Sequence, residues 1–174
     1  MPLNNKTHYL LICFLFLLIV SCGDSNKNKS EECKYKPPAA IFENIEGFTN
    51  HSFEVKGQDA VEKISVPAMN LSIELYQSGC NALQQEYRML LNGTYPLNTL
   101  PEACATDIAE VFFNLSQRAP NQLGLLQQWA EAIKANASAF QYGEEVSFHG
   151  SGISAQINKT HQTKSAMLTI IFSQ

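Results

Sequence analysis

The sequence predicts an α+β domain in which a mostly antiparallel sheet carries a pair of helices on one face. Four runs with alternating apolar and polar residues come first, two segments with helical spacing follow, and three more strand-like runs come last. The gaps between consecutive runs are short, which is typical of antiparallel neighbours. Two blocks of strands around a helical block predict an α+β arrangement rather than a parallel sheet with alternating helices.

The first four expected strands follow an irregular lead-in over 33–47, where Pro37-Pro38 favours extended backbone. They are His51–Val55, Val61–Val66, Asn70–Tyr76 and Ala82–Leu91. The last of these also permits a helix, but period 2 fits better and a turn signal, Asn92-Gly93, comes after it. One face of this sheet is expected to be solvated, and its residues are Glu54, Glu62, Ser72, Glu74, Gln84, Glu86 and Arg88.

Two helices are expected between the blocks of strands. Thr99 and Glu102 have the spacing of a capping box at the start of the first helix. Pro120 is expected to end it, and Asn121 to cap the second. The apolar stripes are Cys104, Ile108, Val111, Phe112 and Leu115 in the first helix and Leu123, Leu126, Ala130, Ile133 and Ala137 in the second.

Three strands are expected after the helices, at Glu144–Gly150, Gly152–Asn158 and Ser165–Phe172. The last is apolar on both faces, because Met167 and Ile171 oppose Leu168, Ile170 and Phe172. Such a pattern predicts a strand that is covered on both sides, either central in the sheet or packed under the helices.

The first 21 residues have the features of a secretory signal. Lys6 precedes an apolar run from Tyr9 to Val20, which is shorter than the roughly 20 residues that span a bilayer. The residues Ile19-Val20-Ser21-Cys22 resemble the lipobox of bacterial lipoproteins. This resemblance implies cleavage between Ser21 and Cys22 and attachment of lipid to the sulfur and the new amine of Cys22. The alternative is an ordinary secretory signal followed by an unrelated cysteine.

The lipobox resemblance also implies a domain organisation and a location. Residues 1–21 are then the signal, 22–32 the lipidated cysteine and a polar tether, and 33–174 a single α+β domain. Several acyl chains on one residue hold a protein stably at a membrane. In enteric lipoproteins an aspartate directly after the lipidated cysteine favours the inner membrane. Gly23 stands there, so the resemblance implies the outer membrane.

The cysteines left after signal removal are Cys22, Cys33, Cys80 and Cys104. With Cys22 lipidated, three remain in an oxidising compartment, and at most one intramolecular bridge can form. Cys104 lies on the apolar stripe of a helix, where a thiol behaves as a small apolar group. We therefore favour a Cys33–Cys80 disulfide, with Cys80–Cys104 as the alternative.

Composition and motifs exclude several function classes. The formal net charge is -4 and no basic cluster occurs, so nucleic acid is not an expected partner. No histidine or cysteine spacing suits zinc and no phosphate-binding loop is present, so no metal or cofactor is expected. The segment Phe148–Gly152 contains His149 beside Ser151. It joins strand to strand, however, whereas a nucleophile elbow joins strand to helix.

The favoured function is a non-enzymatic envelope lipoprotein that binds another envelope macromolecule, as an inhibitor or a complex subunit. The expected contacts are Glu74 and Glu86 on the sheet and Phe113, which lies off the helical stripe. Leu125 and Trp129 also lie off their stripe and widen the apolar surface of the second helix.

Two other functions stay open. One is a carrier of a small apolar ligand held between sheet and helices, where Phe112, Phe113 and Trp129 would line the site. The other is an enzyme using His149, Glu145 or a free thiol.

Overall fold

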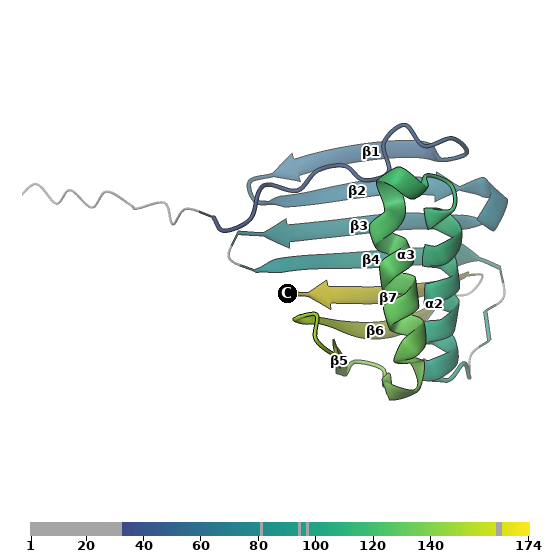
Figure 1. Cartoon of the computed structure of the whole chain (residues 1–174). Helices are drawn as coiled ribbons and strands as arrows, with labels where there is room; N and C mark the ends of the chain where they lie inside the picture. Colours follow the sequence, from purple (N-terminus) through teal and green to yellow (C-terminus); the bar gives the residue numbers. More distant parts are fainter. Residues whose placement is uncertain (1–32, 81, 94, 97, 163–164) are drawn as a thin grey trace, which may run out of the picture. The chain divides into compact units, whose positions relative to one another are not determined.

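Seven strands form one sheet in the order β1-β2-β3-β4-β7-β6-β5 (Figure 1). The computed structural model describes residues 33–80, 82–93, 95–96, 98–162 and 165–174, so the expected signal, Ser21, Cys22 and the tether lie outside it. The strands are β1 (Thr49–Lys56), β2 (Asp59–Val66), β3 (Leu71–Gly79), β4 (Leu83–Asn92), β5 (Glu145–Phe148), β6 (Ile153–Gln162) and β7 (Ser165–Ser173). All pairings between these strands are antiparallel, as expected.

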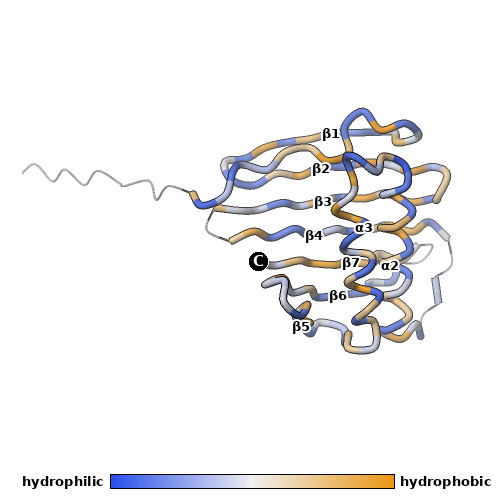
Figure 2. The backbone as a smooth tube through the Cα atoms, in the orientation of Figure 1, coloured by the Kyte–Doolittle hydropathy of each residue, from blue (hydrophilic) through white to orange (hydrophobic). Residues whose placement is uncertain are grey.

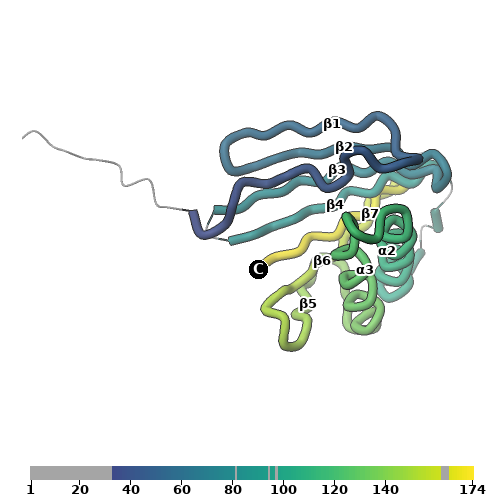
Figure 3. Tube along the Cα trace, turned by 45° about the horizontal axis from the view of Figure 1, so that its top comes forward, coloured from purple at the N-terminus to yellow at the C-terminus, as the bar shows by residue number. Residues whose placement is uncertain are grey.

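Two helices, α2 (Pro101–Ser116) and α3 (Pro120–Ala135), pack on one face of the sheet, which we call the helix face (Figure 3). Two short 3-10 turns, η1 (Pro67–Met69) and η2 (Ala137–Ala139), complete the regular structure of the described part of the chain. No helix of the described residues covers the other face, which we call the open face. The predicted α+β class with a helical pair on one side of the sheet is confirmed.

Side chains point alternately to the two faces of the sheet along each strand. In β3, Leu71, Ile73 and Leu75 are buried on the helix face, while the residues between them are partly exposed on the open face. Figure 2 shows this alternation along β3, whereas β7 is almost continuously apolar. β7 lies in the middle of the sheet, between β4 and β6, as its two apolar faces predicted.

The core is built around the aromatic residues of several elements. The Tyr87 ring of β4 is fully buried and contacts the rings of Phe112, Trp129 and Phe172. The lead-in crosses the helix face beside β2 (Figure 1) and buries Phe42 there. The lead-in is therefore part of the core, which its irregular sequence did not indicate.

Both expected helix caps are wrong. α2 begins at Pro101 with Leu100 as its N-cap, and the Thr99 hydroxyl donates to the carbonyl of Pro96 at 2.8 Å. α3 begins at Pro120, so Asn121 is inside the helix. Proline has a backbone angle already suited to the first helical turn and lacks only an N–H that would be unpaired there. The proline therefore starts each helix, and the polar residues fall outside the cap position.

A disulfide joins Cys33 to Cys80, the favoured pairing, and Cys104 is a buried free thiol. The backbone N–H of Tyr35 also donates to the carbonyl of Cys80 at 3.1 Å. These links fix the start of the lead-in beside the end of β3. Residues 33–174 form one compact unit. Among the described residues, neither helix has the length and apolarity needed to cross a bilayer.

Candidate functional site

The three expected contact residues lie on opposite sides of the domain. Glu74 and Glu86 are on the open face, on β3 and β4. Phe113 is on the outer surface of α2, where 46% of the residue is exposed. The structure therefore does not bring these residues together in one site.

Four charged side chains of the open face form two ion pairs. Lys63 donates to Glu74 at 2.7 Å, and Arg88 donates to Glu86 at 2.6 Å. Tyr76 lies between the pairs, with its hydroxyl on Glu74 and the Arg88 guanidinium 4.1 Å above its ring. The hydrogen bond from Lys63 lowers the pKa of the Glu74 carboxyl. Because both carboxylates are paired, this part of the open face is less acidic than the sequence suggested.

An apolar groove opens on the helix face where β4 and β6 begin and β7 ends. We call it the Trp129 groove, and its lining residues are Leu83, Gln85, Leu125, Trp129, Ile153, Phe172, Ser173 and Gln174. The Trp129 and Phe172 rings stack with centroids 3.8 Å apart and form its apolar wall. Leu125 is 49% exposed at the rim. In the sequence, Leu125 and Trp129 lie off the helical stripe, but no pattern there connects them with the strand ends.

The size of the Trp129 groove limits its occupant. Its volume is about 150 Å³. An engineered apolar cavity of about this volume binds a molecule the size of benzene, whereas pockets for drug-sized ligands are about 300–1,000 Å³. The groove therefore fits a single aromatic or aliphatic side chain better than a whole lipid.

A second groove runs between α2 and α3 on the outside of the helical pair. Phe113, Ala109 and Ala130 supply its apolar floor, and Glu110, Glu131 and Lys134 are among its walls. Its volume is about 330 Å³. The charged walls would have to be desolvated or paired by an occupant, which makes this groove less suited to an apolar group.

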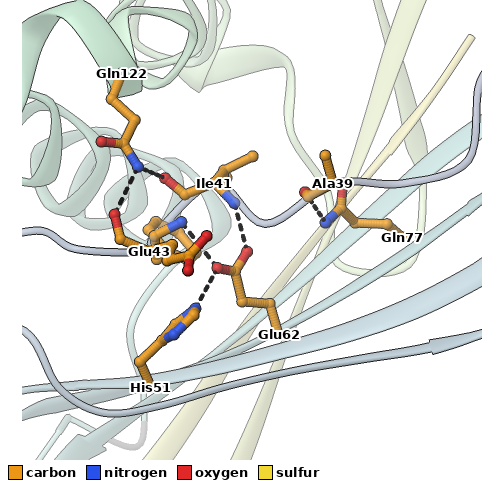
Figure 4. A network of polar contacts seen from close by, with 8 residues as sticks. Ala39, Ile41, Glu43, His51, Glu62, Gln77 and Gln122 are labelled. Atoms are coloured by element: carbon orange, nitrogen blue, oxygen red, sulfur yellow. Dashed lines mark hydrogen bonds and ion pairs between the residues drawn. The ribbon is translucent and has the colours of Figure 1, made fainter.

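Glu62 is the expected open-face residue that the structure places elsewhere. It points to the helix face, and no part of it is exposed. Its Oε2 accepts a hydrogen bond from the backbone N–H of Ile41 at 2.8 Å. Its Oε1 accepts hydrogen bonds from the backbone N–H of Phe42 at 2.9 Å and from Nε2 of His51 at 2.8 Å (Figure 4). A buried carboxylate is tolerated because these donors replace its water.

Two glutamines also donate hydrogen bonds to the lead-in, and we call Glu62 together with Gln77 and Gln122 the Glu62 clasp. Gln122 of α3 donates to the carbonyls of Ile41 and Glu43 at 3.0 and 2.9 Å, and Gln77 of β3 donates to that of Ala39 at 3.2 Å (Figure 4). The sheet and a helix thus hold the lead-in from two sides. Both Glu62 oxygens are occupied by this contact, so the geometry supports a structural role rather than proton transfer.

The free thiol of Cys104 lies among polar groups beneath the start of α2. Tyr95 donates to Asp107 at 2.5 Å, and Tyr142 and Lys159 donate to the carbonyl of Thr99 at 2.8 and 3.0 Å. Burial raises the pKa of the Cys104 thiol, which disfavours the reactive thiolate. A nucleophilic role for this cysteine therefore has no support in its surroundings.

We expect this region to make the domain sensitive to alkali. Burial raises the pKa values of Cys104, Tyr95 and Tyr142 above their ordinary values of 9.0 for the thiol and 10.0 for the phenols. The folded state therefore holds these protons more tightly than the unfolded chain does. The stability that this supplies is fully present below the ordinary pKa values and is lost as the pH rises from them toward the raised pKa values of the folded state. The urea midpoint should fall from about pH 9 upward.

The control for alkali sensitivity is Tyr142→Phe, which removes one of the titrating phenols. Its urea midpoint should fall less steeply with pH than that of the unmodified chain. A midpoint that stays constant to about pH 11 in the unmodified chain would contradict the expectation.

The residues considered for catalysis are not assembled. Ser151 donates to the carbonyl of Phe148 at 2.8 Å and accepts the N–H of Ile153 at 3.1 Å, so its hydroxyl serves the turn between β5 and β6. His149 is exposed in that turn, and Glu145 accepts a hydrogen bond from Ser154. None of these residues lines either groove. Within the described part of the chain, no three His, Cys, Asp or Glu residues group as a metal site would need.

The fold and its surfaces define the class of protein. It is an α+β domain with an internal disulfide, one open sheet face and an apolar groove at one end of the sheet. No protein-family model, curated protein or solved structure matches the chain.

Proposed function

We propose that the chain is a lipid-anchored protein of the bacterial envelope that binds another envelope protein and catalyses no reaction. The Trp129 groove is the proposed contact site, and it receives an apolar side chain of the partner. The observation that carries this proposal is an open groove with a stacked Trp129–Phe172 wall and an exposed leucine, Leu125, at its rim.

The size of the groove favours a protein partner over a carried lipid. Protein interfaces obtain most of their binding energy from a few anchor side chains that fill small apolar pockets. A volume of about 150 Å³ suits one such side chain. A carrier would need a larger enclosed space for its ligand.

The proposed location rests on the lipobox-like residues Ile19–Cys22, with lipid on Cys22. The Cys33–Cys80 disulfide is consistent with an oxidising compartment outside the cytoplasm. Cys22 precedes Cys33 by 11 residues, and the residues between them are polar, as a flexible tether requires. We propose the outer membrane, because Gly23 follows the cysteine.

Glu74 and Glu86 stay as proposed secondary contacts. Lys63 and Arg88 offset their charge, so they would steer a basic partner only weakly.

Cross-linking in intact cells followed by mass spectrometry tests the proposal. The variant Leu125→Glu places a charge at the rim of the Trp129 groove, while Phe113→Glu places one on a similarly exposed residue of α2. One dominant partner should be recovered with the native chain and with Phe113→Glu. Recovery should fall at least tenfold with Leu125→Glu, because truncating or blocking an anchor contact costs about 2 kcal/mol or more. Thermal unfolding of both variants checks that they fold.

Each contrary result removes a different part of the proposal. Full recovery with Leu125→Glu would exclude the Trp129 groove, and loss with Phe113→Glu alone would assign binding to the groove between the helices. A Cys22→Ala chain that still fractionates with the membrane would contradict the lipid anchor.

A further inference from the structure

β1 forms one edge of the sheet, and no strand of the described residues pairs with its outer side. It lies at one end of the strand order and has eight residues, whereas β5 at the opposite edge has four. The register of β1 on β2 is irregular between Thr49 and Ser52, so regular pairing covers Ser52–Lys56. In Figure 1 no other segment with a described structure runs along the outer side of β1 at its arrowhead half. Exposed edges of this kind pair readily with another strand.

The hydrogen-bond pattern shows which groups of β1 face outward. Leu83 and Gln174 exchange both backbone hydrogen bonds, at 3.3 and 3.0 Å. Hydrogen-bonded and non-bonded pairs alternate along antiparallel strands, so this pair fixes the pattern across the whole sheet through the registers. Glu54 is then hydrogen-bonded to Val61 of β2. Phe53 and Val55 direct their N–H and C=O groups away from the sheet.

The side chains of β1 favour one register with a second copy of itself. If Val55 lies opposite Val55 of the second copy, Glu54 lies opposite Lys56 twice, on the open face. A shift that places Phe53 opposite Val55 brings Glu54 against Glu54, which is unfavourable. A shift that places Phe53 opposite Phe53 pairs Glu54 with Ser52 and has no complementary charges.

We propose that two copies of the chain associate through β1, antiparallel and centred on Val55. Their sheets then join into one continuous sheet about a twofold axis, as expected for a symmetric dimer. The contact covers Val55, which is 50% exposed, together with the partly buried Phe53 on the same face. The charge complementarity of Glu54 and Lys56 identifies the partner as a second copy. This inference does not depend on the Trp129 groove.

Cross-linking of single cysteine variants in the full chain tests the register. Val55→Cys should form a disulfide-linked dimer in cells, because facing residues of a bonded pair are about 5.5 Å apart, within the range for disulfides. Phe53→Cys is the matched control, since in this register it faces Gly57 and is about 13 Å from its own counterpart. It should remain monomeric on a non-reducing gel.

Charge exchange provides a second measurement by sedimentation of the mature chain. Lys56→Glu places like charges opposite each other twice and should weaken dimerisation about tenfold. Adding Glu54→Lys restores opposite charges and should restore the dimer.

Three results would overturn the proposal. They are a monomeric Val55→Cys chain, a Lys56→Glu chain that dimerises normally, and a Val55→Cys chain linked to a different protein. The last result would show that β1 receives a strand from another partner instead.

Discussion

Replacing Tyr87 with alanine should lower the free energy of unfolding by about 3–5 kcal/mol. The Tyr87 side chain is fully buried, and its ring lies 4.9, 5.8 and 6.2 Å from the rings of Phe112, Trp129 and Phe172. Truncation removes these contacts and leaves a cavity between the sheet and both helices, which the rigid strands can fill only in part. Urea unfolding followed by circular dichroism measures the effect.

The Tyr87→Phe variant separates the ring from the hydroxyl. The hydroxyl donates to Gln85 at 3.3 Å. Its removal should cost no more than about 1.5 kcal/mol, the usual net contribution of one hydrogen bond. Equal losses from the two variants would show that the polar contact, and not the packing of the ring, dominates at this position.

Removing the disulfide with the double substitution Cys33→Ala and Cys80→Ala should cost about 4 kcal/mol. The two cysteines are 47 residues apart. In the chain-entropy account, a cross-link of this span strongly restricts the unfolded chain. The loss should appear as a lower urea midpoint.

Reduction of the unmodified chain provides the control for the disulfide. The reduced chain and the double variant should unfold at the same urea concentration, because both lack only the cross-link. If the double variant keeps the midpoint of the oxidised chain, the lead-in is held by the Glu62 clasp and the core residue Phe42 without help from the disulfide.

The strands could be predicted because their side chains report which face is buried. Period 2 and the following Asn92-Gly93 turn signal predict a strand rather than a helix over Ala82–Leu91, and β4 confirms that prediction. The bridge between Cys33 and Cys80 could be preferred because Cys104 belongs to a buried helical stripe. In these cases neighbouring residues of the sequence carry the necessary information.

The errors have a different physical origin. Glu62 is expected on the solvated face but is buried, because period 2 places it with Ile64 and Val66, which are buried. Its partners, the amide groups of Ile41 and Phe42, come from a segment with no periodic pattern. Likewise, the Trp129 groove combines ends of strands and a helix that are distant in the sequence, so no local pattern could show it.

The central position of β7 has a consequence for how the chain folds. Its pairing partners are β4 and β6, and β4 is synthesised much earlier than β7. Both partners keep an unpaired edge until β7 is present. If the chain reaches the proposed envelope location N-terminus first, β1 to β4 arrive before the strand that completes the sheet. Pairing between such distant segments is slow, because a long loop must close first. A chain exported in this way would complete its sheet only when β7 arrives, and the exposed edge of β4 would need protection from aggregation until then.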